Sequence, residues 1–213
     1  MIEISADNIA KKYGKKRVLN GISFHHQTTV LGIAGSNGSG KSTLLKIISG
    51  LLKPTSGEIQ WKINKDTLSP KAIIPYIGFS APYVQLYEEL SVVENLRFLV
   101  ELQKNSAIED INDLLHRFEI KKHQNSLYGN LSTGQQQRVK LASAVIKRPS
   151  ILIMDEPGSN LDQKGKSLII NLVQTFRDNN KMVIIASNLE DELDLCDHTI
   201  DLNQFNQEQH VHS

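Results

Sequence analysis

Gly35-Ser36-Asn37-Gly38-Ser39-Gly40-Lys41-Ser42 is the stretch of this sequence that says most about its fold. It fits the pattern G-x-x-x-x-G-K-[ST], in which glycines allow unusual backbone angles and a close approach of the main chain to phosphate groups. A Gly/Ser-rich surface turn is the alternative interpretation. However, a continuous apolar run at residues 28–34 precedes the stretch, and a helix with an apolar side is expected from Lys41. This context favours a phosphate-binding loop between a buried strand and a helix.

Recognition of a nucleotide polyphosphate is the chemistry expected of such a loop. Its N–H groups point inward, and the helix N-terminus adds a partial positive charge of about half a unit. The Lys41 ammonium is expected to contact the outer phosphates of ATP, and the Ser42 hydroxyl to ligate Mg²⁺. Thr43 is expected to line the same site. The predicted cofactors are therefore ATP and Mg²⁺.

Two carboxylates end a second apolar run, at residues 151–154. Asp155 and Glu156 follow this predicted strand directly, and the carboxyl ends of parallel strands border the ligand crevice of an α/β sheet. We expect Asp155 to hold Mg²⁺ through water and Glu156 to act as the general base on the water that attacks the terminal phosphate. Taken alone, an acidic strand end is equally typical of an ordinary cap, so this interpretation depends on the upstream loop.

The remaining pattern predicts how the elements are organised. Short strands are expected at residues 2–9 and 18–24, separated by a polar segment, and another at 57–63. The middle of the chain has helical periodicity from residue 92 to 147. A helix at 164–177 and a buried strand at 183–186 follow. Alternating apolar strands and helices imply a mostly parallel sheet that helices cover on both faces. We expect a nucleotide-binding core at 1–80 and 148–202, a helical subdomain at 81–147 and a frayed polar tail at 203–213.

Composition excludes several other classes. The chain has 213 residues, 39% of them hydrophobic and 22% charged, with a net charge of +1. Such a balance is ordinary for a globular protein and does not predict a nucleic-acid partner. The single cysteine, Cys196, rules out an internal disulfide and is expected to be a packed thiol. The N-terminus has no signal-peptide pattern, and the apolar runs are of strand length, too short to span a bilayer.

A third motif points to a particular family. Leu131-Ser132-Thr133-Gly134-Gln135 begins a predicted helix, and Ser132 with Gln135 would form a capping box in any protein. A capped helix N-terminus that contains a glycine is equally suited to binding an anion. Leu-Ser-x-Gly-Gln is also the signature of ATP-binding cassette (ABC) ATPases, where it lies between the phosphate loop and the acidic strand, as it does here. Over nearly its whole length the chain resembles an ABC ATP-binding subunit.

The resemblance implies a fold and further site residues. The fold is that of a phosphate-loop (RecA-like) NTPase with N-terminal antiparallel strands and an inserted helical subdomain. Tyr13 is similar to the aromatic residue that stacks on adenine, although a tyrosine before glycine is often only a turn residue. Ser132, Gly134 and Gln135 would contact ATP held by a second subunit, either an identical chain or a related one. Asp162 is similar to the acid of the loop that crosses this interface, and it would also cap the next helix.

Two positions depart from the family pattern. The family has a Pro-Gln pair where the core meets the helical subdomain, and its glutamine contacts Mg²⁺. Here Ala81-Pro82 occupies that place. Gln85 lies three residues later and would reach Mg²⁺ only if the loop were remodelled, so we expect it to face solvent or a partner. The family also has a histidine after the last core strand that contacts the terminal phosphate. Asn188 stands there, and it can donate a hydrogen bond but cannot carry a proton at neutral pH.

These features predict the ATP-hydrolysing subunit of an ABC transporter, which works as a dimer on separate transmembrane permease subunits at the inner face of the membrane. The short chain and missing glutamine are also similar to the small cassette subunits of cytochrome c biogenesis (haem-export-type) systems. A soluble ABC ATPase that acts on nucleic acid or ribosomes is a second hypothesis. A nucleotide-binding switch with very weak hydrolysis is a third, favoured by the two departures.

Overall fold

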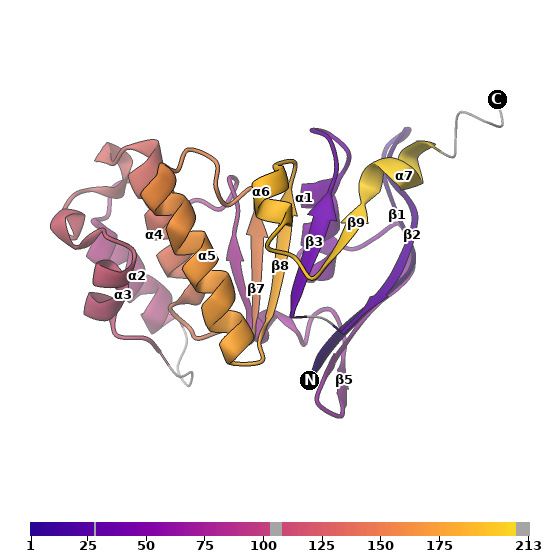
Figure 1. Ribbon diagram of the computed structural model, residues 1–213, viewed down its shortest axis with the longest axis horizontal. Helices are drawn as coiled ribbons and strands as arrows, with labels where there is room; N and C mark the ends of the chain where they lie inside the picture. Colours follow the sequence, from indigo (N-terminus) through magenta and orange to yellow (C-terminus); the bar gives the residue numbers. More distant parts are fainter. Residues whose placement is uncertain (28, 103–107, 208–213) are drawn as a thin grey trace.

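A computed structural model describes residues 1–27, 29–102 and 108–207 of the chain, with side chains up to residue 205. Its elements form a core sheet, a second sheet beside it and a helical lobe on the opposite side (Figure 1). The strands are β1 (Ile2–Tyr13), β2 (Lys16–His26), β3 (Val30–Ala34), β4 (Ser56–Ile63), β5 (Asp66–Leu68), β6 (Ile77–Ser80), β7 (Ile151–Asp155), β8 (Met182–Ser187) and β9 (His198–Asp201), and the helices are α1 (Lys41–Ile48), α2 (Val92–Glu101), α3 (Ile111–Arg117), α4 (Thr133–Val145), α5 (Gln163–Asp178), α6 (Glu190–Leu193) and α7 (Leu202–Gln207).

The core sheet has the strand order β6-β7-β8-β3-β9. Each neighbouring pair is parallel, with registers such as Ile33 opposite Ala186 and Met154 opposite Ile185. Because parallel strands deliver their carboxyl ends to one edge, the loops after β3, β6, β7 and β8 meet at that edge. The predicted α/β fold, with a mostly parallel sheet, is confirmed.

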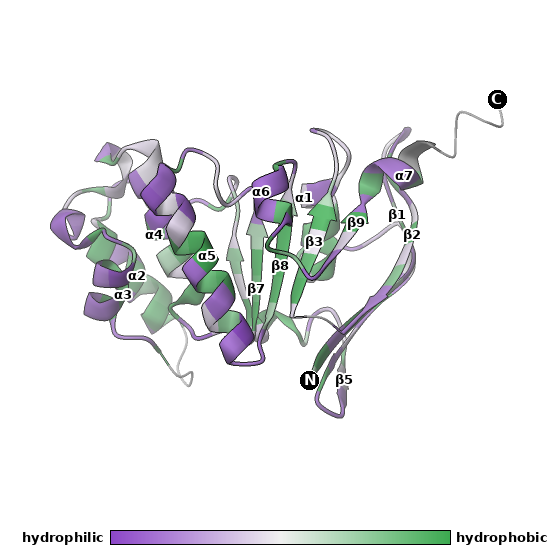
Figure 2. Cartoon of the chain, viewed as in Figure 1, coloured by the Kyte–Doolittle hydropathy of each residue, from purple (hydrophilic) through white to green (hydrophobic). Residues whose placement is uncertain are grey.

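Alternate residues of the core strands belong to two apolar clusters, one on each face of the sheet. Leu152 and Met154 of β7 pack with the helical lobe and α5. Ile151 and Ile153 of the same strand pack with α1 and the second sheet. The central strands β3, β7 and β8 are apolar on both sides (Figure 2), as a sheet buried on two faces requires.

The second sheet has the order β2-β1-β4-β5 and is antiparallel. The polar segment expected to separate its first two strands instead continues both of them. Tyr13 pairs with Lys16 around Gly14, whose φ of 58° suits a tight hairpin turn. The strands extend further than predicted because their exposed charged ends pair with each other and need no burial.

The helical lobe contains α2, α3 and α4 and lies at the far end of the molecule from the antiparallel sheet (Figure 1). Close contact joins α4 to the core strand β6: a Cβ added at Gly78 would lie 2.0 Å from the carbonyl oxygen of Ala144. The signature helix therefore packs directly on the edge of the core sheet.

Three elements correct the expectations. The edge strands β6 and β9 were missed, and the frayed tail from Asn203 is wrong in part, because α7 runs from Leu202 to Gln207. This helix is ordered by packing: Leu202 is buried and Phe205 packs on the apolar cluster beneath the core sheet. Thr28, at the start of one predicted strand, and residues 103–107 and 208–213 lie outside the described residues. None of the helices in the described part of the chain has the length and apolar composition of a membrane-spanning segment.

Candidate functional site

The phosphate loop lies between β3 and α1, as the sequence predicts. Gly40 immediately precedes α1 with a φ of 104°, and a Cβ there would lie 2.5 Å from Leu19 Cδ2, so this position requires glycine. The Lys41 side chain is buried, and its Nζ donates hydrogen bonds to the carbonyl oxygens of Gly35 at 2.7 Å and Ser36 at 3.3 Å. The ammonium group thus lies inside the loop, where an anion would meet it.

A cavity of about 450 Å³ opens beside this loop. The loop and the start of α1 form one wall. Asp155 and Glu156, at the carboxyl end of β7, form another, and the segment after β6 forms a third. The lining residues are Lys16, Val18, Asn37, Gly38, Gly40, Lys41, Ser42, Thr43, Pro82, Tyr83, Asp155 and Glu156. Residues predicted from two distant motifs therefore share one cavity.

Asp155, the last residue of β7, lies at the bottom of the acidic wall. Its carboxylate is hydrogen-bonded to the Ser42 side chain, and burial raises the pKa of this carboxyl despite that hydrogen bond. The second carboxylate oxygen, Oδ2, is buried without a hydrogen-bond partner among the described residues. A buried unpaired carboxylate oxygen is costly unless a cation or a polar ligand satisfies it.

Glu156 follows in an unusual backbone conformation. Its φ is 47°, in the left-handed region that residues other than glycine rarely adopt. The backbone N–H donates to the carbonyl oxygen of Ala186 at 2.8 Å, which continues the β7–β8 pairing by one residue. The carboxylate lies 3.6 Å from Lys41 Nζ. A strained residue held in this way is typical of a functional site.

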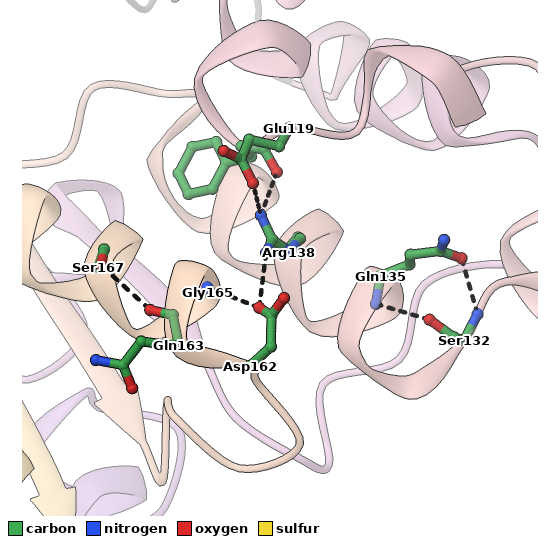
Figure 3. Close-up of polar contacts among 9 residues, drawn as sticks. Glu119, Ser132, Gln135, Arg138, Asp162, Gln163, Gly165 and Ser167 are labelled. Atoms are coloured by element: carbon green, nitrogen blue, oxygen red, sulfur yellow. Dashed lines mark hydrogen bonds and ion pairs between the residues drawn. The ribbon is translucent and has the colours of Figure 1, made fainter.

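The Leu131–Gln135 turn begins α4 and forms the predicted capping box. Ser132 Oγ accepts from the Gln135 N–H at 3.3 Å, and Gln135 Oε1 accepts from the Ser132 N–H at 3.0 Å (Figure 3). The turn borders a second cavity, of about 480 Å³. Its lining residues are Glu119, His123, Ser132, Thr133, Gly134, Gln135, Arg138, Asn160, Asp162 and Lys164. None of these described residues lines the phosphate-loop cavity.

Comparison with known proteins supplies the family. The family model described as "ABC transporter" matches residues 19–159. The chain is 33% identical over 208 residues to the uncharacterized ABC transporter ATP-binding protein YybJ of Bacillus subtilis, covering 95% of this chain and 93% of that protein. The chain belongs to the ABC transporter family. It is an ATP-binding subunit, and the ATP-binding domains of this family are ATPases that dimerise and work with transmembrane permeases.

Solved ABC cassettes share the fold. The dimeric structure of the cassette MJ0796 superposes with a TM-score of 0.81 at 25% identity, covering 93% of this chain and 94% of that one. A post-hydrolysis dimer of the same cassette, bound to ADP and Pi, superposes with a TM-score of 0.80 at 26% identity, covering 93% of each chain. The phosphate-loop NTPase fold expected of an ABC cassette is therefore confirmed.

A buried arginine connects the signature helix of this cassette to the loop after β7. Arg138 donates to Glu119 Oε2 at 2.6 Å and to Asp162 Oδ1 at 2.9 Å (Figure 3). The same Asp162 oxygen accepts from the Gly165 N–H at 2.8 Å and caps α5, as predicted. The contact of Asp162 with a second ABC subunit stays a prediction. Sequence reasoning assigned no role to Arg138, although it lies three residues after Gln135, the last residue of the signature.

Three of the predicted site residues, Tyr13, Gln85 and Asn188, are not among the residues that line the phosphate-loop cavity. Tyr13 is 51% exposed at the end of β1, where Lys11 Nζ lies 5.2 Å from its ring centre. Gln85 and Asn188 are exposed, and neither is among the lining residues of that cavity. Tyr83, which sequence reasoning also missed, lines it instead. Its position next to Ala81-Pro82, where the family pattern is broken, was the available signal.

Proposed function

We propose that this ABC subunit binds Mg-ATP in the phosphate-loop cavity, hydrolyses it, and uses the cycle to drive a membrane transporter. One observation carries the proposal: Lys41, Ser42, Asp155 and Glu156 come from two distant motifs and line a single cavity. A cation, a hydroxyl and two carboxylates are suited to phosphoryl transfer to water. This reaction depends on positioning the attacking water and on neutralising the charge of the phosphate oxygens.

The residues present fit a magnesium ion. Ser42 and Asp155 are hydrogen-bonded to each other, and the buried Oδ2 of Asp155 is without a hydrogen-bond partner among the described residues. A hydroxyl and a carboxylate are ligands that Mg²⁺ prefers, usually with several waters retained. Ser42 would hold the ion directly and Asp155 through water. When bound, the ion neutralises charge on the phosphate oxygens.

Lys41 and Glu156 divide the remaining chemistry. Nζ of Lys41 now contacts the carbonyl oxygens of Gly35 and Ser36, and phosphate oxygens would replace these contacts as charge-assisted acceptors. Glu156 accepts the proton of the attacking water as general base. The water oxygen bonds to the terminal phosphorus while the bond to the bridging oxygen breaks, which leaves ADP and phosphate.

A second copy of this chain completes each site in our proposal. The signature turn and the phosphate loop line separate cavities within one chain, so one subunit supplies half of each nucleotide site. The capped N-terminus of α4, with Ser132 and Gly134, offers N–H groups to the terminal phosphate of the partner's ATP. The pairing of two identical chains, rather than of two related ones, is part of the proposal.

Coupling to transport follows from this arrangement. Nucleotide binding closes the dimer, hydrolysis reopens it, and the helical lobe transmits the movement to permease subunits, which hold the chain at the inner membrane face. Co-purification of the chain with permease subunits from detergent-solubilised membranes would support this coupling. Recovery only with ribosomes or DNA would instead support a soluble ABC ATPase.

Slow hydrolysis is expected, because Gln85 and Asn188 are exposed and neither lines the cavity. Glu156→Gln removes the general base while keeping the size of the side chain. Steady-state phosphate release should fall by about 100-fold or more, while ATP binding persists. Lys41→Ala is the comparison, because it should reduce ATP binding itself. Equal turnover of the Glu156→Gln and unmodified proteins would contradict the proposed role of Glu156.

A further inference from the structure

The wall of the phosphate-loop cavity that follows β6 is built from Pro82 and Tyr83. Gln85, the family-based candidate for this side of the site, is exposed and is not among the lining residues. A phenol therefore occupies the wall between the start of α1 and the carboxylates at the end of β7. Neither the phosphate-loop motif nor the acidic strand end assigns a role to this side chain.

Contacts from three elements hold the Tyr83 segment in place. Lys46, in the last turn of α1, places its Nζ 3.8 Å from the centre of the Tyr83 ring, a close cation–π contact. Phe79 of β6 packs against the same ring with centroids 6.0 Å apart. Lys140 of α4 donates to the carbonyl oxygen of Pro82 at 3.0 Å. The ring therefore has a defined position.

The phenol is chemically a hydrogen-bond donor here. A tyrosine hydroxyl has an ordinary pKa of about 10. The hydroxyl of Tyr83 therefore carries its proton near neutral pH and can donate it in a hydrogen bond. A protonated phenol donates well to phosphate oxygens but is a poor ligand for a metal ion, which favours oxygen ligands that carry charge.

We propose that the Tyr83 hydroxyl donates a hydrogen bond to the terminal phosphate of bound ATP, from the cavity wall that follows β6. The proposal rests on the function proposed above, because the terminal phosphate must lie next to Glu156 and Asp155 for hydrolysis. ADP has no such phosphate. Tyr83 should therefore contribute to the affinity for ATP and not to the affinity for ADP.

Tyr83→Phe tests this most sharply, because it keeps the ring and its contacts with Lys46 and Phe79 and removes only the hydroxyl. Dissociation constants for Mg-ATP and Mg-ADP are measured by isothermal titration calorimetry in the Glu156→Gln background, which prevents turnover. The dissociation constant for ATP should rise about tenfold, the scale of one lost hydrogen bond to a charged group. That for ADP should change less than about twofold.

Tyr87→Phe is the matched control. Tyr87 is 53% exposed, packs edge-on against Phe98 and does not line the cavity, so its loss of a hydroxyl should change neither constant. Equal weakening of ATP and ADP by Tyr83→Phe would show a packing role only and overturn the inference. Unchanged ATP affinity in Tyr83→Phe, or the selective loss appearing in Gln85→Ala, would also overturn it. Failure of the parent protein to bind Mg-ATP would instead contradict the proposed function itself.

Discussion

Several residues in or near the nucleotide cavity have energetically unfavourable conformations or environments that packing alone does not explain. Glu156 has a left-handed backbone conformation, and Asp155 has a buried oxygen with no hydrogen-bond partner in the part of the chain that the structure describes. Glu192 is a third case: it is 5% exposed, and its Oε1 accepts from the N–H of Gly158 at 2.7 Å. Through this bond, the segment after β8 fixes the start of the loop that runs from Glu156 to Asp162.

The pKa of Glu192 gives a pH-dependent prediction. Burial raises this pKa above its ordinary value, outweighing hydrogen bonds from Ser187 and Gly158. The folded state therefore binds the proton more tightly than the unfolded state, and the free energy of unfolding falls as pH rises from the unfolded value of about 4.3 through the folded pKa. Glu192→Gln cannot ionise and keeps an acceptor for Gly158.

Calorimetric melting temperatures between pH 4.5 and 8 check this prediction. The melting temperature of Glu192→Gln minus that of the unmodified protein should become more positive as pH rises through this window. A difference that stays constant across the window would show that Glu192 does not titrate differently in the folded state.

At the scale of elements, the signature turn stabilises the N-terminus of α4 in addition to its proposed role in binding ATP. Ser132 caps α4, and Ser91 caps α2 with the same pair of reciprocal hydrogen bonds. Replacing either serine by alanine should cost about 1 kcal/mol of stability and lower the melting temperature by roughly 2–4 °C. Only Ser132→Ala should also weaken ATP-dependent dimerisation, measured by analytical ultracentrifugation. Equal ATP-dependent dimerisation of the two variants would show that Ser132 only caps α4 and does not contribute to ATP binding between subunits.

Some of the strands could be predicted from the sequence, and others could not. The runs at residues 28–34, 151–154 and 183–186 are apolar on both faces, so their burial was readable, and they became β3, β7 and β8. The edge strand β9, His198–Asp201, has one buried residue among four, which leaves no pattern for a strand. Pairing with β3, which is distant in the sequence, holds β9 in place. Just before β9, Oδ2 of Asp197 accepts a hydrogen bond from the N–H of Val30, which lies 167 residues earlier.

The residues of the site also fall into two groups, those that the sequence predicts and those that it does not. Lys41, Ser42, Asp155 and Glu156 belong to motifs with fixed spacing, so sequence alone predicted that they meet, and the structure brings them to one cavity. Tyr83 and Arg138 have no spacing rule. Their contacts with Lys46, Glu119 and Asp162 depend on tertiary packing between segments that are far apart in the sequence, which no local pattern encodes.

At the scale of the whole molecule, the two functional cavities have different linings and complementary chemistry. The phosphate-loop cavity contains cation and carboxylates, and the signature cavity contains a capped helix N-terminus with Arg138 and Lys164. In our proposal, these two cavities are the two unlike halves of a nucleotide site. Two chains related by a two-fold axis would, in the same proposal, form two complete sites, in a closed isologous pair.

The mass of the Glu156→Gln chain in saturating Mg-ATP tests this claim most directly. Light scattering after size exclusion should give about twice the chain mass of 23.9 kDa, because unhydrolysed ATP keeps both sites filled. Without nucleotide, or with Lys41→Ala added, the mass should return to that of one chain. A single-chain mass in saturating Mg-ATP, with nucleotide binding verified in the same sample, would contradict the shared site.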